Sequence, residues 1–417
     1  MQSTVRIFAL GLLAATALGG VPRNAAATNG MNPICYGTDN CGMGGAGVAV
    51  TGNAAGAILN PALSGRAGRE LFISAGWLHA DVTGQVKGGN AAQGANNQPA
   101  SQESGAENFP DGTIALNWKF NNQWAANLAA FPGGGGATEW TFPRTNGFGS
   151  NDRQIRTRYM FFEPSISYTP EVEKTWSFGA GLVISRQDMK TNSPSAQGAA
   201  PSPGPTQAVD VSMGAGFHLG VFWQPEGLAR KDYLSLGATY RSQIWAEGYE
   251  KYKNIFVSSM DMPAQWIVGV AVKPIDRWTF AADFKHIAWE SVTGIGGKQP
   301  AQGGFGWKDQ FVVAGGIAHD LTDWFTWRVG YNYGKSPIDE SHMFANFLFP
   351  AITEHHLTAG VSAKIGPRYE VGASAYWAPE VSITNNPNAP ENFAAIGGNT
   401  TVEHSQYGAQ VSLKVKF

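Results

Sequence analysis

Apolar and polar residues alternate with a period of two along most of the chain after about Glu70. Clear examples are residues 114–120, 176–184, 209–223, 266–272 and 407–417, where the residues between the apolar ones are largely Gly, Ser, Thr, Asn, His or Lys. This period places successive side chains on opposite faces of a β-strand. A soluble β-sandwich also alternates, but its strands are shorter and its turns more regular. We therefore predict long strands with one apolar face and one polar or closely packed face.

The interruptions between these strands fall into two classes that alternate along the chain. Long stretches rich in Gly, Asn, Pro and Ser lie near 86–109, 138–155, 190–206, 246–262, 292–308, 334–353 and 384–404, and short breaks lie near 121–122, 169–174, 225–231, 274–277, 320–323 and 366–368. Outer-membrane barrels have long external loops and tight periplasmic turns. The pattern predicts an all-β fold, a transmembrane antiparallel β-barrel of 14 strands over residues 70–417, with 12 and 16 as alternative counts. The aromatic C-terminal residue, Phe417, is usual for such barrels.

Composition narrows the class further. Only 14% of the 417 residues are charged, against about 25% in ordinary soluble domains. The chain has 53 glycines and 12% aromatic residues, and its net charge is −2, which does not favour nucleic-acid binding. No apolar run reaches the length of about 18 residues that a membrane-spanning helix needs. These values fit a barrel in the outer membrane of a Gram-negative bacterium.

The N-terminal residues indicate export. Arg6 precedes an apolar stretch, and the small residues 25–27 form a cleavage site, so residues 1–27 are predicted to be a signal peptide. Cys35 and Cys41 are the only cysteines, and in an oxidising compartment we expect them to form a disulfide. Two free thiols are the alternative. We expect no metal site, because two cysteines without nearby histidines cannot complete a tetrahedral shell.

About forty residues, 28–69, lie between the predicted signal peptide and the first strand. A barrel of 14 strands encloses more space than its own side chains can fill, since eight strands are about the packed limit. The segment contains GMGGAGVAV and the turn signal Asn60-Pro61-Ala62, and its small residues allow close packing against a barrel wall. We predict that residues 28–69 form a plug inside the barrel.

The segment CGMGGAGVAVTGNAAGAILNPAL resembles the N-terminal plug, called the hatch, of the FadL-type outer-membrane transporters of fatty acids and aromatic hydrocarbons. The runs at 262–292, 304–338 and 354–363 are similar to later strands of that family, so the resemblance extends over essentially the whole mature chain. It implies passive uptake of hydrophobic small molecules without a cofactor. The expected surroundings are outer-membrane lipid and lipopolysaccharide, with no nucleic-acid partner, and we expect a monomer.

A hydrophobic solute needs a sideways exit into the membrane, and such an exit requires missing ladder hydrogen bonds. Phe131, Pro132, Gly133 and Gly134 interrupt the predicted third strand, where proline removes a donor and glycine removes side chains. The family similarly has a kink in its third strand beside the hatch. We therefore predict a lateral opening here, with a plain loop start as the alternative.

Candidate ligand contacts lie in loops and at strand ends. We expect the loop residues Phe256, Phe344, Phe347 and Phe349 to form an exposed capture patch, with loop–loop packing as the alternative. By the family's pattern, Arg186 and Lys308 match basic residues that hold a carboxylate head group near the upper lumen. Binding of lipopolysaccharide phosphates is the alternative role for both, and it is the role assigned to the arginines at 144, 153, 156 and 158.

Three other classes remain as alternatives. An open porin for hydrophilic solutes predicts a charged constriction, and a structural or adhesive barrel predicts neither uptake nor conductance. An enzyme would need a nucleophile, a base and an orienting residue on one wall. His355 and His356 are adjacent and so point to opposite faces of a strand, and we predict no catalysis. Within the transport class, fatty acids and small aromatic hydrocarbons remain competing substrates.

Overall fold

The computed structural model describes residues 29–87, 100–141, 152–170, 175–191, 208–226, 228, 232–253, 256, 258–296, 304–386 and 399–417. The predicted signal peptide and Arg144 lie outside these residues. In the part of the chain that is described, no helix is long and apolar enough to cross a membrane.

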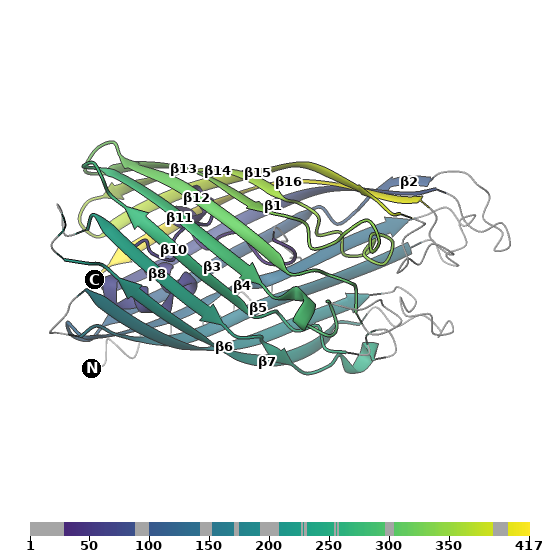
Figure 1. Cartoon of the computed structure of the whole chain (residues 1–417), viewed down its shortest axis with the longest axis horizontal. Coiled ribbons are helices and arrows are strands. Elements are labelled where there is room, and N and C mark those ends of the chain that lie inside the picture. The colour runs from purple at the N-terminus through teal and green to yellow at the C-terminus, as the bar shows by residue number, and fades with distance from the viewer. Residues whose placement is uncertain are drawn as a thin grey trace.

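The strands form one closed antiparallel β-barrel (Figure 1). Fourteen strands make up its wall, which confirms the predicted count: β1 (Glu70–Lys87), β3 (Asn108–Lys119), β4 (Trp124–Thr141), β5 (Asp152–Tyr168), β6 (Trp176–Thr191), β7 (Asp210–Trp223), β8 (Leu234–Arg241), β10 (Gln265–Val272), β11 (Trp278–Ile287), β12 (Gln310–Asp320), β13 (Phe325–Gly334), β14 (His355–Ile365), β15 (Tyr369–Thr384) and β16 (Asn399–Lys416). Two short strands, β2 (Ala100–Glu103) and β9 (Trp245–Ala246), pair with β1 and β7 without crossing the barrel. The barrel closes where β1 pairs with β16 along its whole length.

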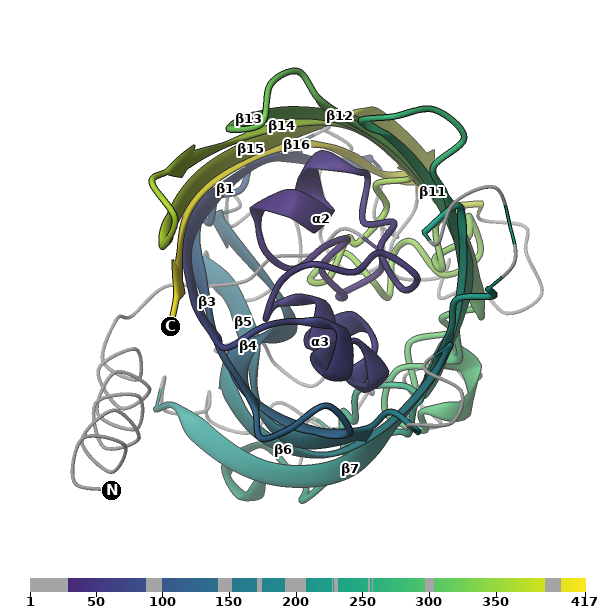
Figure 2. The same cartoon turned by 90° about the vertical axis from the view of Figure 1, so that its left-hand side faces the viewer.

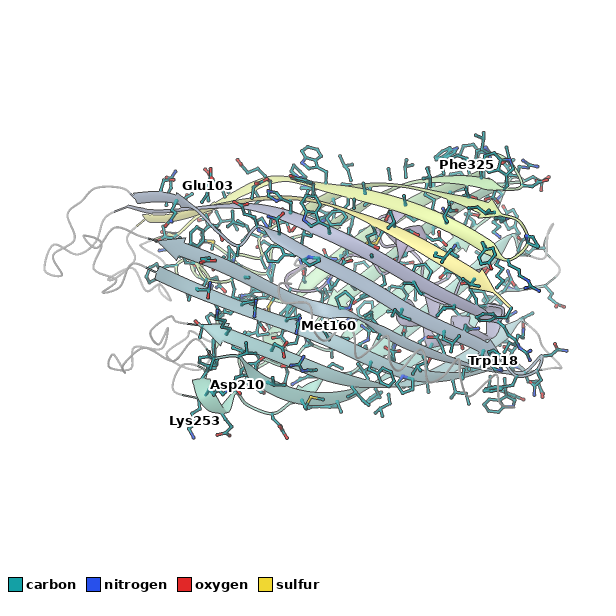
Figure 3. The ribbon with its side chains drawn as sticks, turned by 180° about the vertical axis from the view of Figure 1, so that it is seen from behind. Glu103, Trp118, Met160, Asp210, Lys253 and Phe325 are labelled. Carbon is teal, nitrogen blue, oxygen red and sulfur yellow. A yellow bond between two sulfur atoms is a disulfide. The ribbon has the colours of Figure 1, made fainter. Side chains whose placement is uncertain are left out.

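The outer face of the wall is apolar, as a lipid-facing surface requires. Leu182, Phe217, Val313 and Val411 are among its exposed large side chains. Figure 3 shows side chains projecting from the wall, with Trp118 at the short-turn end of β3. Tryptophans gather at that end, where Trp176 stacks on Trp223 with ring centroids 5.5 Å apart, as expected for an interfacial belt.

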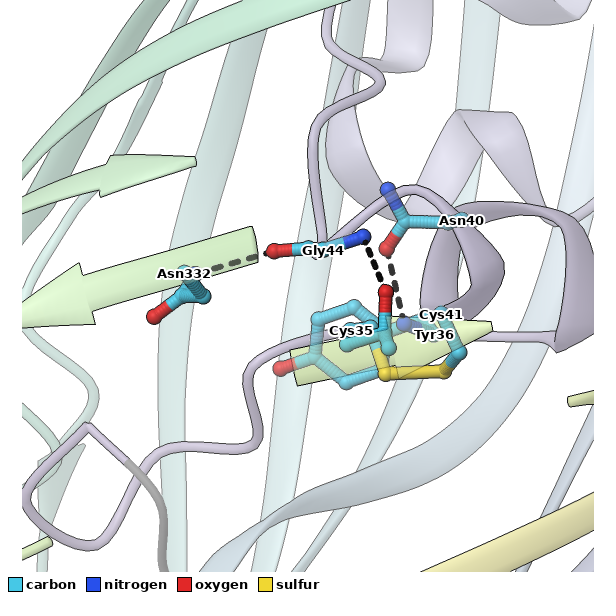
Figure 4. The surroundings of a disulfide bond; sticks show 7 residues. Cys35, Tyr36, Asn40, Cys41, Gly44 and Asn332 are labelled. Atoms are coloured by element: carbon cyan, nitrogen blue, oxygen red, sulfur yellow. Dashed lines mark hydrogen bonds between the residues drawn. A yellow bond between two sulfur atoms is a disulfide. The ribbon is translucent and has the colours of Figure 1, made fainter. Parts of the chain in front are cut away.

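Residues 29–69, for which we keep the name hatch, lie inside the barrel (Figure 2). They form α2 (Thr38–Gly42), α3 (Gly56–Leu59) and the 3-10 helix η2 (Pro61–Arg66). Helix α2 contacts β13 to β16, and η2, which directly follows α3, contacts β4 to β7 on the opposite side. Cys35 and Cys41 form a disulfide around the start of α2, and Gly44 of the same turn accepts a hydrogen bond from Asn332 of the wall (Figure 4).

Candidate functional site

The motif Asn60-Pro61-Ala62 fixes the hatch to the wall. The Asn60 carboxamide accepts a hydrogen bond from Ala62 N, and its Nδ2 donates to the backbone oxygens of Val48 and Val221 at 3.0 Å. The opposing wall positions are Gly179 and Gly220, where an added Cβ would lie within 2.3 Å of Pro61 and 2.0 Å of Asn60 Oδ1 respectively. Glycine is required there because the Pro61–Ala62 backbone lies too close to Gly179, and the Asn60 side chain too close to Gly220, for any side chain at these positions.

A buried charge network holds the other side of the hatch. Asp39 of α2 pairs with Arg328 of β13 at 3.2 Å and with Lys414 of β16, and Lys414 also pairs with Glu370 of β15 at 2.7 Å. Burial alone would raise the pKa of Asp39, but the neighbouring Lys414 and Arg328 outweigh it and hold that pKa well below its ordinary value. The carboxylate is therefore ionised, and it ties α2 to two strands.

The wall is interrupted between β3 and β4. These strands pair from Lys119 opposite Ala125 to Ile114 opposite Ala130, and no further ladder pair follows among the described residues. Beyond that point β3 continues to pair with β1, and β4 continues to pair with β5. The two edges meet again only near the external end, where Gly105 N donates to Glu139 O at 2.9 Å. A gap in the ladder therefore lies between residues 106–113 and 131–138.

The sequence of β4 explains the gap. Pro132 has no N–H to donate, and the register between β4 and β5 shifts between Pro132 and Gly134, so that Gly133 is the extra residue of a bulge. Gly134 has a φ of +147°, which favours glycine, and an added Cβ would lie 2.3 Å from Met31 O. Gly135 N donates to the same carbonyl at 3.1 Å. The hatch thus contacts β4 at the kink, which lies in the third barrel-crossing strand as the sequence pattern predicted.

Aromatic rings and charges surround the start of this gap. Phe131 packs edge-on against Tyr36 of the hatch at 5.1 Å and against Phe161 at 5.7 Å. The Arg241 guanidinium lies over the Phe131 ring at 5.6 Å and donates to Ile58 O of α3. The charge of Arg241 is balanced by Glu163, 3.6 Å away. The charges and rings of this cluster therefore have their partners within the protein.

An apolar pocket lies beside the gap. Both gap edges line it, with Phe109 from β3 and Gly136 and Ala137 from β4. The remaining lining residues come from the hatch, β1, β16 and the segment before β14: Met31, Leu78, Ala80, Val82, Phe349, Pro350, Ala351, His404 and Gln406. Its cavity volume is about 40 Å³. The pocket is therefore narrow, and a bound solute requires the lining side chains to move apart.

The predicted capture patch is not exposed, and the alternative of loop packing is the correct one. Phe256 and Phe349 are buried and belong to one cluster through Phe305, whose ring centroid lies 6.3 Å and 5.5 Å from theirs. Phe347 stacks on Trp140 at 4.6 Å, and Phe344 is half-buried. The loops turn inward, because packing these rings together removes them from water. Of the four, Phe349 reaches the pocket.

The two predicted head-group residues do not line the pocket. Arg186 lies on the outer face of β6, opposite the exposed Met213, and pairs with Asp188 at 3.0 Å. The expectation that it faces the lumen is therefore wrong, because its position in the alternation puts it outside. Lys308 precedes β12 and is exposed beside Glu290, 3.9 Å away. Arg158 pairs with Asp188 on the neighbouring strand, and lipopolysaccharide contact by Arg156 and Arg158 stays a prediction.

Among the pocket's lining residues, the sequence predicts only Phe349 as a ligand contact. Met31, His404 and Gln406 are three of the residues that sequence reasoning missed. Met31 stands in a stretch without periodicity. His404 and Gln406 are polar residues at alternate positions of β16, and that spacing indicated only that they share the inner face. The pairing of β16 with β1 brings them near the gap, and this non-local contact leaves no mark in the local pattern.

Comparison with known families gives a match over nearly the whole chain. Residues 24–416 match the model of a family described as "Outer membrane protein transport protein (OMPP1/FadL/TodX)". No curated protein matches the sequence significantly.

Solved structures with the same fold include the toluene transporter TodX of Pseudomonas putida, with a TM-score of 0.68, 17% identity, and coverage of 92% of this chain and 99% of that one. A Pseudomonas aeruginosa FadL homologue has a TM-score of 0.67 at 17% identity, with coverage of 94% and 100%. The Ralstonia pickettii toluene transporter TbuX has a TM-score of 0.60 at 17% identity, with coverage of 92% and 98%. At these identities the similarity establishes the fold.

Proposed function

We infer the function from the premise that this chain belongs to the outer membrane protein transport family (OMPP1/FadL/TodX). It is therefore a β-barrel of the Gram-negative outer membrane, in a family that transports hydrophobic compounds. We propose that it takes up small hydrophobic molecules by passive diffusion, that they bind in the apolar pocket, and that they leave sideways through the gap between β3 and β4.

The proposal rests mainly on the observation that residues of both gap edges line the pocket. Phe109 on one edge and Gly136 and Ala137 on the other both line the pocket, so a bound molecule borders the unpaired backbone. Missing ladder bonds are costly where the wall faces lipid, because no water replaces them there. A local interruption that is shaped by Pro132 and four consecutive glycines is better explained by an exit than by a defect.

The hatch supports a lateral rather than an axial route. Asp39 and Asn60 attach it to β13, β16 and β7, which holds it inside the barrel across an axial path. Met31, in contrast, both lines the pocket and contacts β4 at the kink, so a small movement of the hatch's first residues would change access to the gap. We assign the gating role to this segment.

The proposal is tested by repairing the ladder. Deleting Gly133 together with Pro132→Thr removes the bulge and returns an N–H donor, which lets β4 pair with β3. Uptake of radiolabelled toluene and oleate is then measured in cells that lack other channels of this family. We expect uptake to fall at least tenfold, to the level of cells without the protein.

Pro164→Thr is the matched control. Pro164 lies in the neighbouring strand β5, opposite Leu128, where the ladder between β4 and β5 is regular. This variant should transport as the wild type does. Unchanged uptake after repair of the gap, in a barrel shown to be folded and inserted, would rule out the lateral exit.

A further inference from the structure

The pocket is lined by apolar groups apart from His404 and Gln406. We propose that these two residues select neutral ligands that carry a hydroxyl group, such as phenols, over plain hydrocarbons and over carboxylate anions. The inference rests on the proposed function, since it concerns which hydrophobic molecules occupy the same pocket.

His404 presents an unused hydrogen-bond acceptor. Its side chain is 5% exposed, and Nδ1 lies 2.8 Å from Pro350 O, which can only accept, so Nδ1 carries the proton. Its Nε2 is buried and has no hydrogen-bond partner. Because His404 is enclosed by apolar groups and hydrogen-bonds no carboxylate, its ring is neutral and Nε2 is an acceptor.

Gln406 presents a second unused polar atom. It is 1% exposed, and its Nε2 lies 3.2 Å from Nε2 of His356 and 3.4 Å from Oγ1 of Thr353. Its Oε1 is buried without a partner. A hydroxyl has one proton, which it can donate to His404 Nε2 or to Gln406 Oε1. With the carboxamide turned so that its NH2 group faces the pocket, the hydroxyl donates to His404 and accepts from Gln406.

The two residues share the inner face of β16, because they are two positions apart and both pair toward β15, His404 with Val381 and Gln406 with Ala378. Buried polar atoms normally have a hydrogen-bond partner. His404 Nε2 and Gln406 Oε1 have none, and we infer that a polar group of the ligand is the missing partner. A site built to hydrogen-bond a hydroxyl strongly rejects the analogue that lacks it.

The lining also argues against an anion. Among the described residues, no Lys or Arg lines this pocket, and the charged residues on the gap edge 106–113, Glu107 and Asp111, are both acidic. Burial of a carboxylate beside two acceptors and without a cation is strongly unfavourable. A long-chain acid could therefore place its alkyl chain here but not its ionised head group.

Three ligands with the same ring and methyl group separate these cases: toluene, p-cresol and p-toluate. The full-length protein in nanodiscs is dialysed to equilibrium against each radiolabelled ligand, with empty nanodiscs as the blank for partition into lipid. We expect p-cresol to bind at least tenfold more tightly than toluene, and p-toluate to bind the weakest. Equal affinity for p-cresol and toluene, or tighter binding of p-toluate, overturns the inference without any variant.

The variants then assign the effect to the two residues. His404→Phe and Gln406→Met, alone and together, keep the volume and remove the polar atoms. We expect the ratio of p-cresol to toluene affinity to fall at least tenfold in the double variant, and an unchanged ratio overturns the assignment.

Phe349→Leu is the control that separates this inference from the proposed function. It alters an apolar part of the same pocket, so it should weaken both ligands and leave the ratio unchanged. If it weakens both while wild-type protein does not distinguish them, the pocket is the binding site and the hydroxyl inference alone fails. If it weakens neither, the proposed pocket itself fails.

Discussion

The hatch meets the barrel wall in two different ways. On the side of β13 to β16, Asp39 pairs with Arg328 and Lys414, and Thr38 Oγ1 hydrogen-bonds Ser412 at 2.6 Å. The wall there is a continuous ladder that closes through β1 and β16. At the gap between β3 and β4, Gly135 N donates to Met31 O, and Tyr36 of the hatch packs on Phe131. The difference indicates that ion pairs anchor the hatch where the wall is complete, whereas ring packing and a backbone hydrogen bond hold it beside the gap.

The largest effect is expected when the anchored side is broken. Asp39→Ala leaves Arg328 without its carboxylate and removes one of the two carboxylates that pair with Lys414, which keeps Glu370. Removal of one partner of a buried ion pair costs about 3–5 kcal/mol, and the remaining Glu370 favours the lower end of that range. The hatch should loosen, so that the thermal midpoint falls and the single-channel conductance in planar bilayers rises at least tenfold. Asp323→Ala breaks an Arg–Asp pair at an exposed periplasmic turn and is the control. If conductance is the same in both variants, the anchor is not what holds the hatch.

The same anchor should be insensitive to mild acid. The pKa of Asp39 is held below its ordinary value by Lys414 and Arg328, which outweigh its burial. Its contribution to stability is complete above the unfolded-state pKa of about 3.9 and is lost as the pH falls toward the lower folded-state pKa. Conductance measured at pH 7 and pH 5 should therefore be equal. A rise at pH 5 would mean that another group controls the hatch.

A smaller effect is expected at the lightly attached side. Gly134→Ala places a Cβ against Met31 O and imposes an unfavourable φ, which costs about 1–3 kcal/mol. Gly136→Ala is the matched control, because the nearest atom to its new Cβ is Phe349 Cδ1 at 3.8 Å. Thermal unfolding of the two variants should differ by that amount, and equal midpoints would contradict the tight contact at the kink.

No effect on transport is expected from a cross-link between β1 and β16, the two strands whose pairing closes the barrel. Ala75 and Val411 are opposite each other in the ladder of β1 and β16 and lie on the outer face. Replacing both with cysteine and cross-linking them should leave toluene uptake unchanged, because the proposed exit lies elsewhere. Loss of uptake on oxidation, with recovery on reduction, would move the exit to this seam.

Much of the fold is visible in the sequence because it depends on local patterns. Alternation with a period of two marks each strand, and the contrast of long and short breaks gives the count of 14. The pairing of Cys35 with Cys41 and the position of the kink at Pro132 also follow from neighbouring residues. A transmembrane strand must satisfy its backbone in the ladder, so the pattern has few alternatives.

The site is less visible because it depends on contacts between distant segments. Alternation with a period of two identifies the residues that share one face of a strand. It does not identify the inner face when both faces carry apolar residues. The family's pattern predicts Arg186 in the lumen, although its position in β6 puts it outside. Phe256 is expected in solvent because it lies in a loop, but the loop folds inward, and no local pattern indicates this. The wall glycines 179 and 220 gave no signal of their own, since only the docked Pro61 explains them.

The close contact of the hatch with Gly179 and Gly220 also has a consequence for the order in which the barrel assembles. Pro61 touches the backbone of β6 and β7 so closely that no side chain fits between them, and the hatch directly precedes β1, half of the seam that closes the barrel. Sliding such a segment into a finished cylinder would require the wall to part. The simplest route is for the strands to wrap around a hatch that is already in place, with β16 joining β1 last, so that the plug serves as the template on which the cylinder is completed.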